Sequence, residues 1–430
     1  MSPRTSAAAV SPARACAYAV VRRVFEQAAY ADRAFHAEAA GLEGRDRSFA
    51  MALAYGTVQR RGTLDHVAAR LISRPLAKLD PPVLAALRLG LMQLLLMDGV
   101  AEHAAVHESV ELAKRDAPAG SGLVNAVLRR ATREGADILA AVGEQTPPAA
   151  AVRHSVPQWL AELWWRELGA ERARGLLAAV NAPAESALRV NTLVTSPPAL
   201  AGQLGVPAHP AAGLPEGLVL DAPFDAHASA VWGAGAIMPQ SRGSMTVART
   251  LAPQPGDRVL DLCAAPGGKT THLAALMGDE GELVAVERHR GRAESLGRTL
   301  ERMHVTCATI EVGDAAQPRP GSGYDRVLVD PPCSGLGTLQ ARPDLRWRTN
   351  PQRIAELAPL QAAILRTGAR ATRPGGTLVY SVCTISGAEG DGIVDGFLAD
   401  TPGWERESVR QLAPDTDGTD GFFIARLQRQ

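Results

Sequence analysis

The sequence has little that would hold a protein together covalently or place it in a membrane. It contains five cysteines among 430 residues, and their spacing shows none of the pairs of a disulfide framework. The longest apolar stretch, residues 83–97, is interrupted by Arg88 and Gln93 and is too short to span a bilayer. Residues 1–15 lack the apolar core of a signal peptide. We therefore expect a cytoplasmic protein in a reducing compartment, with cysteine thiols available for chemistry and no membrane partner.

Net charge is also missing, and lysine is scarce. The 45 basic and 45 acidic residues cancel, which is a poor signal for a nucleic-acid partner. Residues 1–140 hold 18 basic against 14 acidic residues, so they carry +4 and the rest of the chain −4. A solvated surface explains this asymmetry nearly as well as RNA binding does. Lysine occurs at three positions only, and one of them, Lys269, lies in the most informative segment of the chain.

That segment is residues 261–270, which read Asp-Leu-Cys-Ala-Ala-Pro-Gly-Gly-Lys-Thr. It follows an apolar run and precedes a helix-like stretch, so it predicts the strand, turn and helix that open a nucleotide-binding βαβ unit. Gly267 and Gly268 allow a sharp turn and a close approach to a ligand. A phosphate-binding P-loop is disfavoured because it needs a glycine where Cys263 stands, and the dinucleotide pattern G-x-G-x-x-G is absent.

Further strands are predicted along the second half of the chain, and a polar or thiol side chain follows most of them. The strands are expected at residues 282–286, 306–312, 324–329, 376–381 and 422–425. The candidates that follow them are Glu287, Asp314, Asp330 with Cys333, and Cys383. Open α/β sheets bind ligands at this carboxyl edge. There Glu287 is placed to accept hydrogen bonds from a ribose, although a solvated strand-end glutamate is an equal interpretation of that residue alone.

The front of the chain has a different pattern. Residues 1–143 read as a helical domain, with helix-length apolar faces at 82–97, 104–115 and 122–131. His103 and His107 lie four residues apart, but no zinc motif or cysteine pair accompanies them, so we expect no metal site.

A linker at residues 144–148 leads to a small α+β module, residues 150–235, and then to the α/β core, residues 236–430. The module has a helical stretch at 157–168 and strand-like stretches at 188–190 and 217–220. Its tryptophans at 159, 164 and 165 favour helix packing over stacking on bases.

Together, the segments 261–270, 330–335 and 380–383 resemble the bacterial Sun/Fmu family, ribosomal RNA small-subunit methyltransferase B. These proteins are S-adenosylmethionine-dependent RNA cytosine-C5 methyltransferases. The resemblance implies a Rossmann-like methyltransferase core behind an N-terminal all-α domain similar to the antiterminator NusB. It covers nearly the whole chain, since it also takes in residues 46–47, 87–90, 124–129, 188–192 and 420–423.

The resemblance also implies a role for each candidate residue. Glu287 would bind the ribose of S-adenosylmethionine and Asp314 its adenine, while Asp330 would contact both the cofactor and the target ring. The turn around the methionine part of the cofactor would consist of Cys263, Ala264, Ala265, Pro266, Gly267, Gly268 and Lys269.

The two later cysteines suit methylation at cytosine C5. This carbon is a poor nucleophile until a thiolate adds to C6, and a base must afterwards remove the C5 proton. Either cysteine alone would be interpreted as a buried structural thiol, but their joint placement at the ligand edge favours catalysis. The resemblance assigns attack to Cys383 and release to Cys333. Methylation of an amino group is disfavoured, since Cys333 stands where such enzymes have an aromatic residue after Asp-Pro-Pro.

Two positions depart from the family pattern, and the substrate stays open. Val382 stands where threonine is usual, and Ser241 where aspartate is common. We expect a monomer that methylates 16S ribosomal RNA without a metal ion. The alternatives are a methyltransferase acting on transfer RNA or another ribosomal site, and a catalytically inert RNA-binding protein, because target choice depends on surface shape and single-strand presentation.

Overall fold

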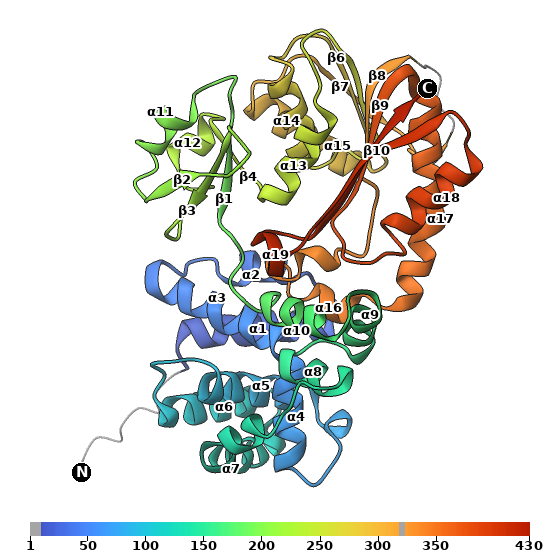
Figure 1. The fold of residues 1–430 in the computed structure, drawn as a ribbon. Helices are drawn as coiled ribbons and strands as arrows, with labels where there is room; N and C mark the ends of the chain where they lie inside the picture. Colours follow the sequence, from blue (N-terminus) through green and yellow to red (C-terminus); the bar gives the residue numbers. More distant parts are fainter. Residues whose placement is uncertain (1–9, 318–322) are drawn as a thin grey trace, which may run out of the picture. The chain divides into compact units, whose positions relative to one another are not determined.

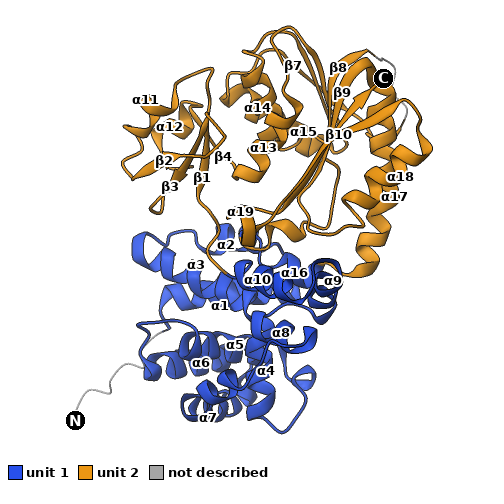
Figure 2. Ribbon diagram, viewed as in Figure 1, with its two compact units in different colours: residues 1–181, 341–348 blue, residues 182–340, 349–430 orange. Residues whose placement is uncertain are grey.

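The computed structural model describes residues 10–317 and 323–430 (Figure 1). Residues 1–9, on which part of the signal-peptide argument depends, lie outside the described residues. The chain forms two compact units: Met1–Asn181 with Ala341–Arg348, and Ala182–Gln340 with Thr349–Gln430 (Figure 2). Across both described ranges, no helix combines the length and the apolar character needed to cross a membrane.

The first unit is helical, as its apolar periodicity predicts. Proline occupies the first turn of α1, α5 and α8, where the missing N–H costs no hydrogen bond. Tyr18, Leu53 and Leu87 are among the fully buried side chains of its core. The helices are α1 (Pro12–Glu26), α2 (Ala31–Glu38), α3 (Gly44–Gln59), α4 (Arg61–Leu71), α5 (Pro81–Leu95), α6 (Glu102–Asp116), α7 (Ser121–Ala140), α8 (Pro147–His154), α9 (Gln158–Leu168) and α10 (Ala170–Ala179).

Helices α8 to α10 belong to this helical unit, although they lie in the range predicted for the small module. Trp164 of α9 is fully buried, in keeping with helix packing. The division into three domains, at 143/150 and 235/236, is finer than the two compact units and stays a prediction.

Residues 341–348, with the short helix α16 (Leu345–Arg348), also belong to the helical unit. The guanidinium of the fully buried Arg346 donates to the carbonyl oxygens of Ser155 and Val180, at 3.1 and 3.2 Å. The indole N–H of Trp347 donates to the carbonyl of Val58 at 2.7 Å. A segment that begins eight residues after Cys333 is therefore part of the helical unit's packing.

In the second unit, a four-stranded antiparallel sheet comes first along the chain, in the order β2-β3-β1-β4. Its strands are β1 (Ala187–Val190), β2 (Ala208–Pro210), β3 (Gly217–Leu220) and β4 (Ile237–Pro239), accompanied by α11 (Pro197–Ala201) and α12 (Ala230–Gly233). Leu188, Leu218 and Ile237 form its core. The two strands predicted in this region, at 188–190 and 217–220, are confirmed.

A seven-stranded sheet in the order β10-β11-β9-β8-β5-β6-β7 forms the centre of this unit. The strands β5 to β9 run parallel, and β10 and β11 are antiparallel additions. From β5 the chain adds β6 and β7 on one side and then β8 and β9 on the other. The strand order therefore reverses between β5 and β8, and a ligand is expected at the carboxyl ends of these two strands. The strands are β5 (Arg258–Asp261), β6 (Glu282–Glu287), β7 (Ala308–Val312), β8 (Tyr324–Val329), β9 (Thr372–Val382), β10 (Trp404–Leu412) and β11 (Phe422–Arg429).

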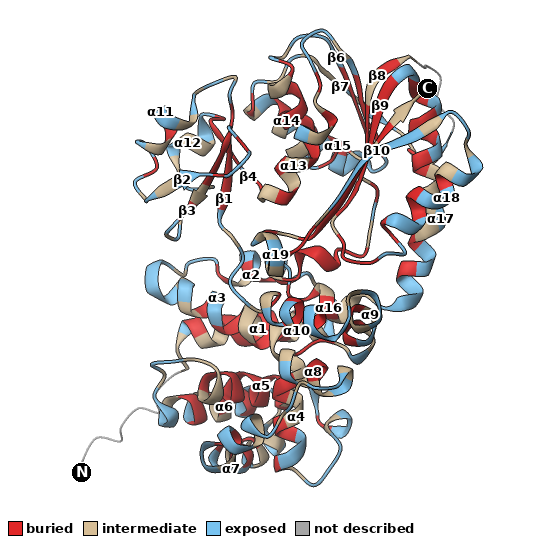
Figure 3. Ribbon diagram, viewed as in Figure 1, coloured by how far each residue is buried: buried red, intermediate tan, exposed pale blue. Residues whose placement is uncertain are grey.

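Helices cover both faces of this sheet, and its central strands are buried (Figure 3). Val247, Leu251 and Leu273 pack on one face, whereas Ile364 and Val394 pack on the other. The helices are α13 (Arg242–Leu251), α14 (Gly268–Leu276), α15 (Arg290–Arg302), α17 (Pro351–Ala371), α18 (Asp391–Asp400) and α19 (Pro414–Asp417). All the strands predicted from the second half of the sequence are present, and β10 is an additional one.

Candidate functional site

The glycine turn lies between β5 and α14. Gly267 has φ +105°, and a β-carbon there would lie 2.8 Å from a methyl group of Leu296, so both backbone conformation and space require glycine. The hydroxyl of Thr270 donates to the carboxylate of Asp261 at 2.7 Å and fixes the first turn of the helix. Burial raises the pKa of Asp261 to about 6. The turn thus presents the N-terminal end of α14 at the sheet edge.

The candidate ribose and adenine ligands follow neighbouring strands. Glu287 ends β6 and is almost fully buried, and its Oε1 accepts the N–H of His289 at 2.8 Å. Asp314 follows β7, and its Oδ1 accepts the N–H of Ala316 at 3.0 Å. Arg292 is 3.5 Å from the second oxygen of Glu287. Both carboxylates keep acceptor lone pairs for further donors, as the hydroxyls of a ribose and the amino group of an adenine require.

Lys269 and Asp330 form an ion pair at the ends of the central strands. Nζ of Lys269 is 2.8 Å from Oδ2 of Asp330, while Oδ1 accepts the hydroxyl of Ser381 at 2.8 Å. Burial lowers the pKa of Lys269, but the charge of Asp330, the hydrogen bond to it and the charges of Cys383 and Asp261 together outweigh burial and raise the pKa. The ammonium is therefore charged at neutral pH, and it lies 5.1 Å from the ring centroid of Phe422.

The two predicted catalytic cysteines come together here. The Sγ atoms of Cys333 and Cys383 are 3.3 Å apart, although the residues are 50 positions apart in sequence. The hydrogen bond to Cys383, burial and the negative charges of Glu389 and Asp330 raise the pKa of Cys333 well above its usual value. The Cys383 sulfur instead interacts electrostatically with the Lys269 ammonium. The raised pKa keeps the Cys333 thiol protonated, and the Lys269 ammonium stabilises negative charge at Cys383.

Cys263, in the turn, lies in a different environment. Burial, together with the carboxylates of Asp330, Asp261 and Glu287, raises the pKa of its thiol well above the usual value. Its sulfur is thus a neutral thiol at physiological pH, which suits contact with a ligand rather than nucleophilic attack.

The structure shows where the two residues that depart from the family pattern, Ser241 and Val382, are placed. Ser241 is the N-cap of α13, where its hydroxyl accepts the N–H of Ser244 at 3.3 Å, and aspartate is an equally good cap. Val382 is fully buried at the end of β9. Its side chain packs in the apolar core of the sheet.

Four polar residues surround the cysteines, and sequence reasoning gave a role only to Thr384, as a hydroxyl that could substitute for the threonine usual at position 382. Ser334 directly follows a candidate cysteine, which is a signal that could have found it. Ser381, at the end of β9, binds Asp330, and Glu389 binds both Ser334 and Thr384. Glu389 has no comparable signal, because it follows no strand and lies in no recognised motif.

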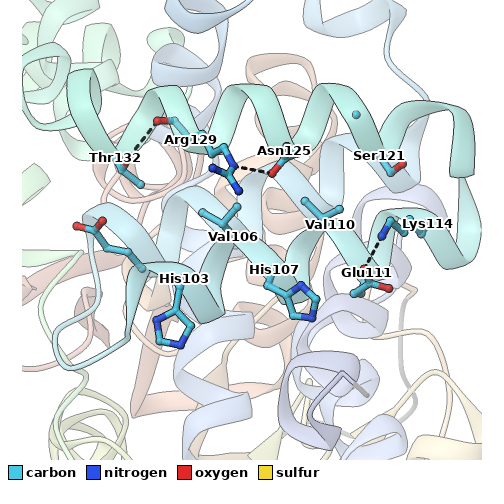
Figure 4. A pocket seen from close by; sticks show the side chains of 12 residues that line it. His103, Val106, His107, Val110, Glu111, Lys114, Ser121, Asn125, Arg129 and Thr132 are labelled. Carbon is cyan, nitrogen blue, oxygen red and sulfur yellow. Dashed lines mark hydrogen bonds and ion pairs between the residues drawn. The ribbon is translucent and has the colours of Figure 1, made fainter. Parts of the chain in front are cut away.

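His103 and His107 lie elsewhere, along a groove of about 720 Å³ between α6 and α7 of the helical unit (Figure 4). Both histidines are exposed. On the α7 side of the groove, Nε of Arg129 donates to Oδ1 of Asn125, one helical turn away. Among the residues with described positions, no group of three or more possible metal ligands is found.

Three family models match the chain. The model of the 16S rRNA methyltransferase RsmB/F family matches residues 248–428, that of the NusB family residues 11–133, and that of an RsmF/B-like ferredoxin-like domain residues 156–227. These matches confirm the predicted fold class, a NusB-like helical domain and a small α+β domain with a methyltransferase core.

Whole-length comparisons agree. The probable ribosomal RNA small subunit methyltransferase B of Synechocystis is 38% identical, covering 97% of this chain and 99% of that protein. The crystal structure of PH0851 has a TM-score of 0.83 at 26% identity, covering 99% of this chain and all of that one.

The structure of NSun6 from Pyrococcus horikoshii with SFG has a TM-score of 0.59 at 25% identity, covering 64% of this chain and 98% of that one. The cysteine pair, the glycine turn and the strand-end carboxylates thus occur in a chain whose full length matches this enzyme class. It belongs to the 16S rRNA methyltransferase RsmB/F family of S-adenosylmethionine-dependent methyltransferases.

Proposed function

We propose that this protein methylates C5 of a cytosine in 16S ribosomal RNA through a covalent adduct between Cys383 and cytosine C6. The observation that carries the proposal is the 3.3 Å approach of Cys333 and Cys383 beside the Lys269–Asp330 pair. Support for the substrate comes from the names of the relatives, ribosomal RNA small subunit methyltransferase B.

The cofactor-binding residues fit S-adenosylmethionine. A β-carbon at Gly268 would meet nothing within 4 Å, so the start of α14 leaves room for close approach, and Glu287 and Asp314 keep free acceptor capacity at the ends of adjacent strands. S-adenosylmethionine, when bound, supplies an electrophilic methyl group. SFG, found with NSun6, is an analogue of this cofactor.

The protein's own residues account for the remaining steps. The thiolate of Cys383 forms a bond to C6, N3 takes up a proton from solvent, and the Asp330 carboxylate is placed to accept the hydrogen bond of that N3–H, so that electron density moves to C5. Once C5 has bonded to the methyl carbon, a water molecule acting as base takes the C5 proton, the C5–H electron pair re-forms the ring double bond, the C6–sulfur electron pair returns to Cys383, and N3 gives its proton back. The protonated Cys333 thiol is placed to assist release by donating a hydrogen bond to the departing Cys383 thiolate. Lys269 favours the thiolate on Cys383 before attack.

Separate substitution of the cysteines tests this assignment. Cys383→Ala should abolish turnover and give no covalent RNA adduct, because the attacking sulfur is missing. Cys333→Ala should still attack and methylate once, and then stall as a protein–RNA conjugate. The measurement is a denaturing gel after incubation with 16S RNA and S-adenosylmethionine, with bisulfite sequencing to locate the product.

Cys307→Ala is the matched control, because Cys307 lies beside Asp279 and outside the site. It should behave as the wild type does. An adduct from Cys383→Ala and none from Cys333→Ala would exchange the two roles.

We also propose that the enzyme works as a cytoplasmic monomer without a metal ion. A thiolate nucleophile and a sulfonium methyl donor already provide both reacting partners, so the chemistry requires no Lewis acid.

A further inference from the structure

We propose that Glu389 is a positioning residue that holds Cys333 and Cys383 together by joining the two loops that carry them. Its relevance to catalysis rests on the proposed function, but its effect on the cysteine geometry can be measured without any substrate. The side chain binds Ser334 and Thr384, the residues that follow the two cysteines, so it acts through these neighbours.

The carboxylate of Glu389 is fully buried. Its Oε1 binds the loop that follows β8 and carries Cys333. This oxygen accepts the backbone N–H of Ser334, the residue after Cys333, at 2.8 Å. It also accepts Nε2 of Gln361 at 3.1 Å, and the same Gln361 amide donates to the carbonyl of Pro332 at 2.9 Å. The loop is therefore fixed on both sides of Cys333.

The second oxygen reaches both loops. Oε2 of Glu389 accepts the hydroxyl of Ser334 and, at 3.0 Å, the hydroxyl of Thr384, which directly follows Cys383. The two hydroxyl oxygens are themselves 2.9 Å apart. The backbone carbonyl of Glu389 accepts the hydroxyl of Tyr380, in the strand that leads to Cys383, at 2.7 Å. One residue thus connects the sequence neighbours of both cysteines.

Burying a carboxylate in this space costs its hydration free energy. The carboxylate has four hydrogen-bond donors, three side chains and the backbone N–H of Ser334, and all are neutral. Hydrogen bonding alone must therefore compensate the loss of hydration. An apolar residue would fill the site at lower cost but would leave the donors of Ser334, Thr384 and Gln361 unsatisfied. The arrangement is explained if the relative position of the two loops must be fixed.

The loops are also joined by a bond from the N–H of Gly337 to the carbonyl of Cys383, at 3.0 Å. We therefore expect removal of the Glu389 carboxylate to loosen the cysteine pair without unfolding the unit. The negative charge contributes as well, since Glu389 is among the groups that raise the pKa of Cys333 and keep its proton in place.

Two substitutions separate hydrogen bonding from charge. Glu389→Ala removes both. Glu389→Gln removes the charge but keeps the geometry, because its oxygen can accept from Ser334 N–H and Gln361 while its amide donates to the two hydroxyl oxygens.

The readout is stoichiometric capture of phenylarsine oxide by the full-length protein, which requires two adjacent thiols, with Cys383→Ser as the baseline. Wild type and Glu389→Gln should bind one equivalent, and Glu389→Ala should bind at least tenfold more weakly. In turnover, Glu389→Ala should lose about 100-fold in kcat with little change in KM for S-adenosylmethionine, the scale of a 1 Å misplacement, and Glu389→Gln should recover most of it.

Glu216→Ala is the control for general loss of a buried carboxylate in the same unit, and it should keep the arsenical site. If Glu389→Ala does not fold, Thr384→Val and Ser334→Ala replace it, each removing part of the same link. Unchanged arsenical binding in folded Glu389→Ala, or in both replacement variants, would overturn the positioning role. Intact capture in wild type without cytosine methylation would instead count against the proposed function alone.

Discussion

At the scale of single residues, Glu287 carries the clearest prediction about the cofactor. Glu287→Ala should weaken S-adenosylmethionine binding by about 1–3 kcal/mol, roughly 5- to 150-fold, because a buried acceptor is lost. The measurement is calorimetric titration of the folded variant.

Glu282→Ala is the matched control, because Glu282 begins the same strand but is exposed and paired with Arg258. Its affinity should equal that of the wild type. Equal affinity for Glu287→Ala and Asp314→Ala as well would remove both residues from the cofactor site.

At the scale of elements, the turn between β5 and α14 contains two adjacent glycines with different constraints. Gly267→Ala should lower the free energy of unfolding by about 1–3 kcal/mol and weaken cofactor binding, because φ is +105° and Leu296 lies in the way. Gly268→Ala should be nearly neutral for stability, since its β-carbon would meet nothing within 4 Å. Thermal unfolding and titration of both variants test this. If both variants keep wild-type stability but lose cofactor affinity equally, contact with the cofactor, rather than backbone strain, requires the glycines.

The packing of α14 on the small sheet gives a pH-dependent prediction. His272 is buried, and its Nε2 lies 2.6 Å from Oε1 of Glu216. Among the described residues, none accepts a hydrogen bond from Nδ1, so a second ring proton would be left without a partner. Burial lowers the pKa of His272 from 6.5 to about 4. Between these pH values the unfolded chain binds more protons at this residue, so the free energy of unfolding should fall as the pH is lowered, by up to about 3 kcal/mol.

Denaturant unfolding from pH 7 to 4.5 measures this slope. His272→Gln should flatten it, whereas His209→Gln, at an exposed histidine paired with Asp221, should leave it unchanged. The same slope in His272→Gln as in the wild type would assign the pH dependence to other groups.

At the scale of the whole molecule, the chain returns to the helical unit through residues 341–348. A protein that begins at Ala150 lacks α1 to α7 and with them the Val58 carbonyl that accepts from Trp347. We expect trypsin to cut after Arg346 slowly in the full chain, where this residue is buried, and rapidly in the truncated one.

The exposed Arg288 serves as the internal reference site and should be cut at similar rates in both proteins. Mass spectrometry of timed digests gives the comparison. Equal protection of Arg346 would show that residues 150–181, with only part of α8, are enough to hold the segment. Loss of RNA binding in such a truncation would report on this packing as well as on direct contacts.

Local signals in the chain were enough to predict the α/β sheet, its strand-end candidates and the helical front. Residues 327–329 and 378–380 are apolar runs within the predicted strands, and the carboxyl ends of these strands must share one edge of a parallel sheet. The strand β10 was not predicted because its side chains are mostly exposed and polar, and it is held by pairing with β11.

Folding in three dimensions decided the rest. The distance between the sulfurs of Cys333 and Cys383, the burial of Glu389 between their loops and the return of residues 341–348 to the helical unit all join positions far apart in sequence. No local pattern encodes such contacts, because they depend on how separate strands and helices pack. The sequence therefore names the candidate reacting groups, and the packing sets which of them meet.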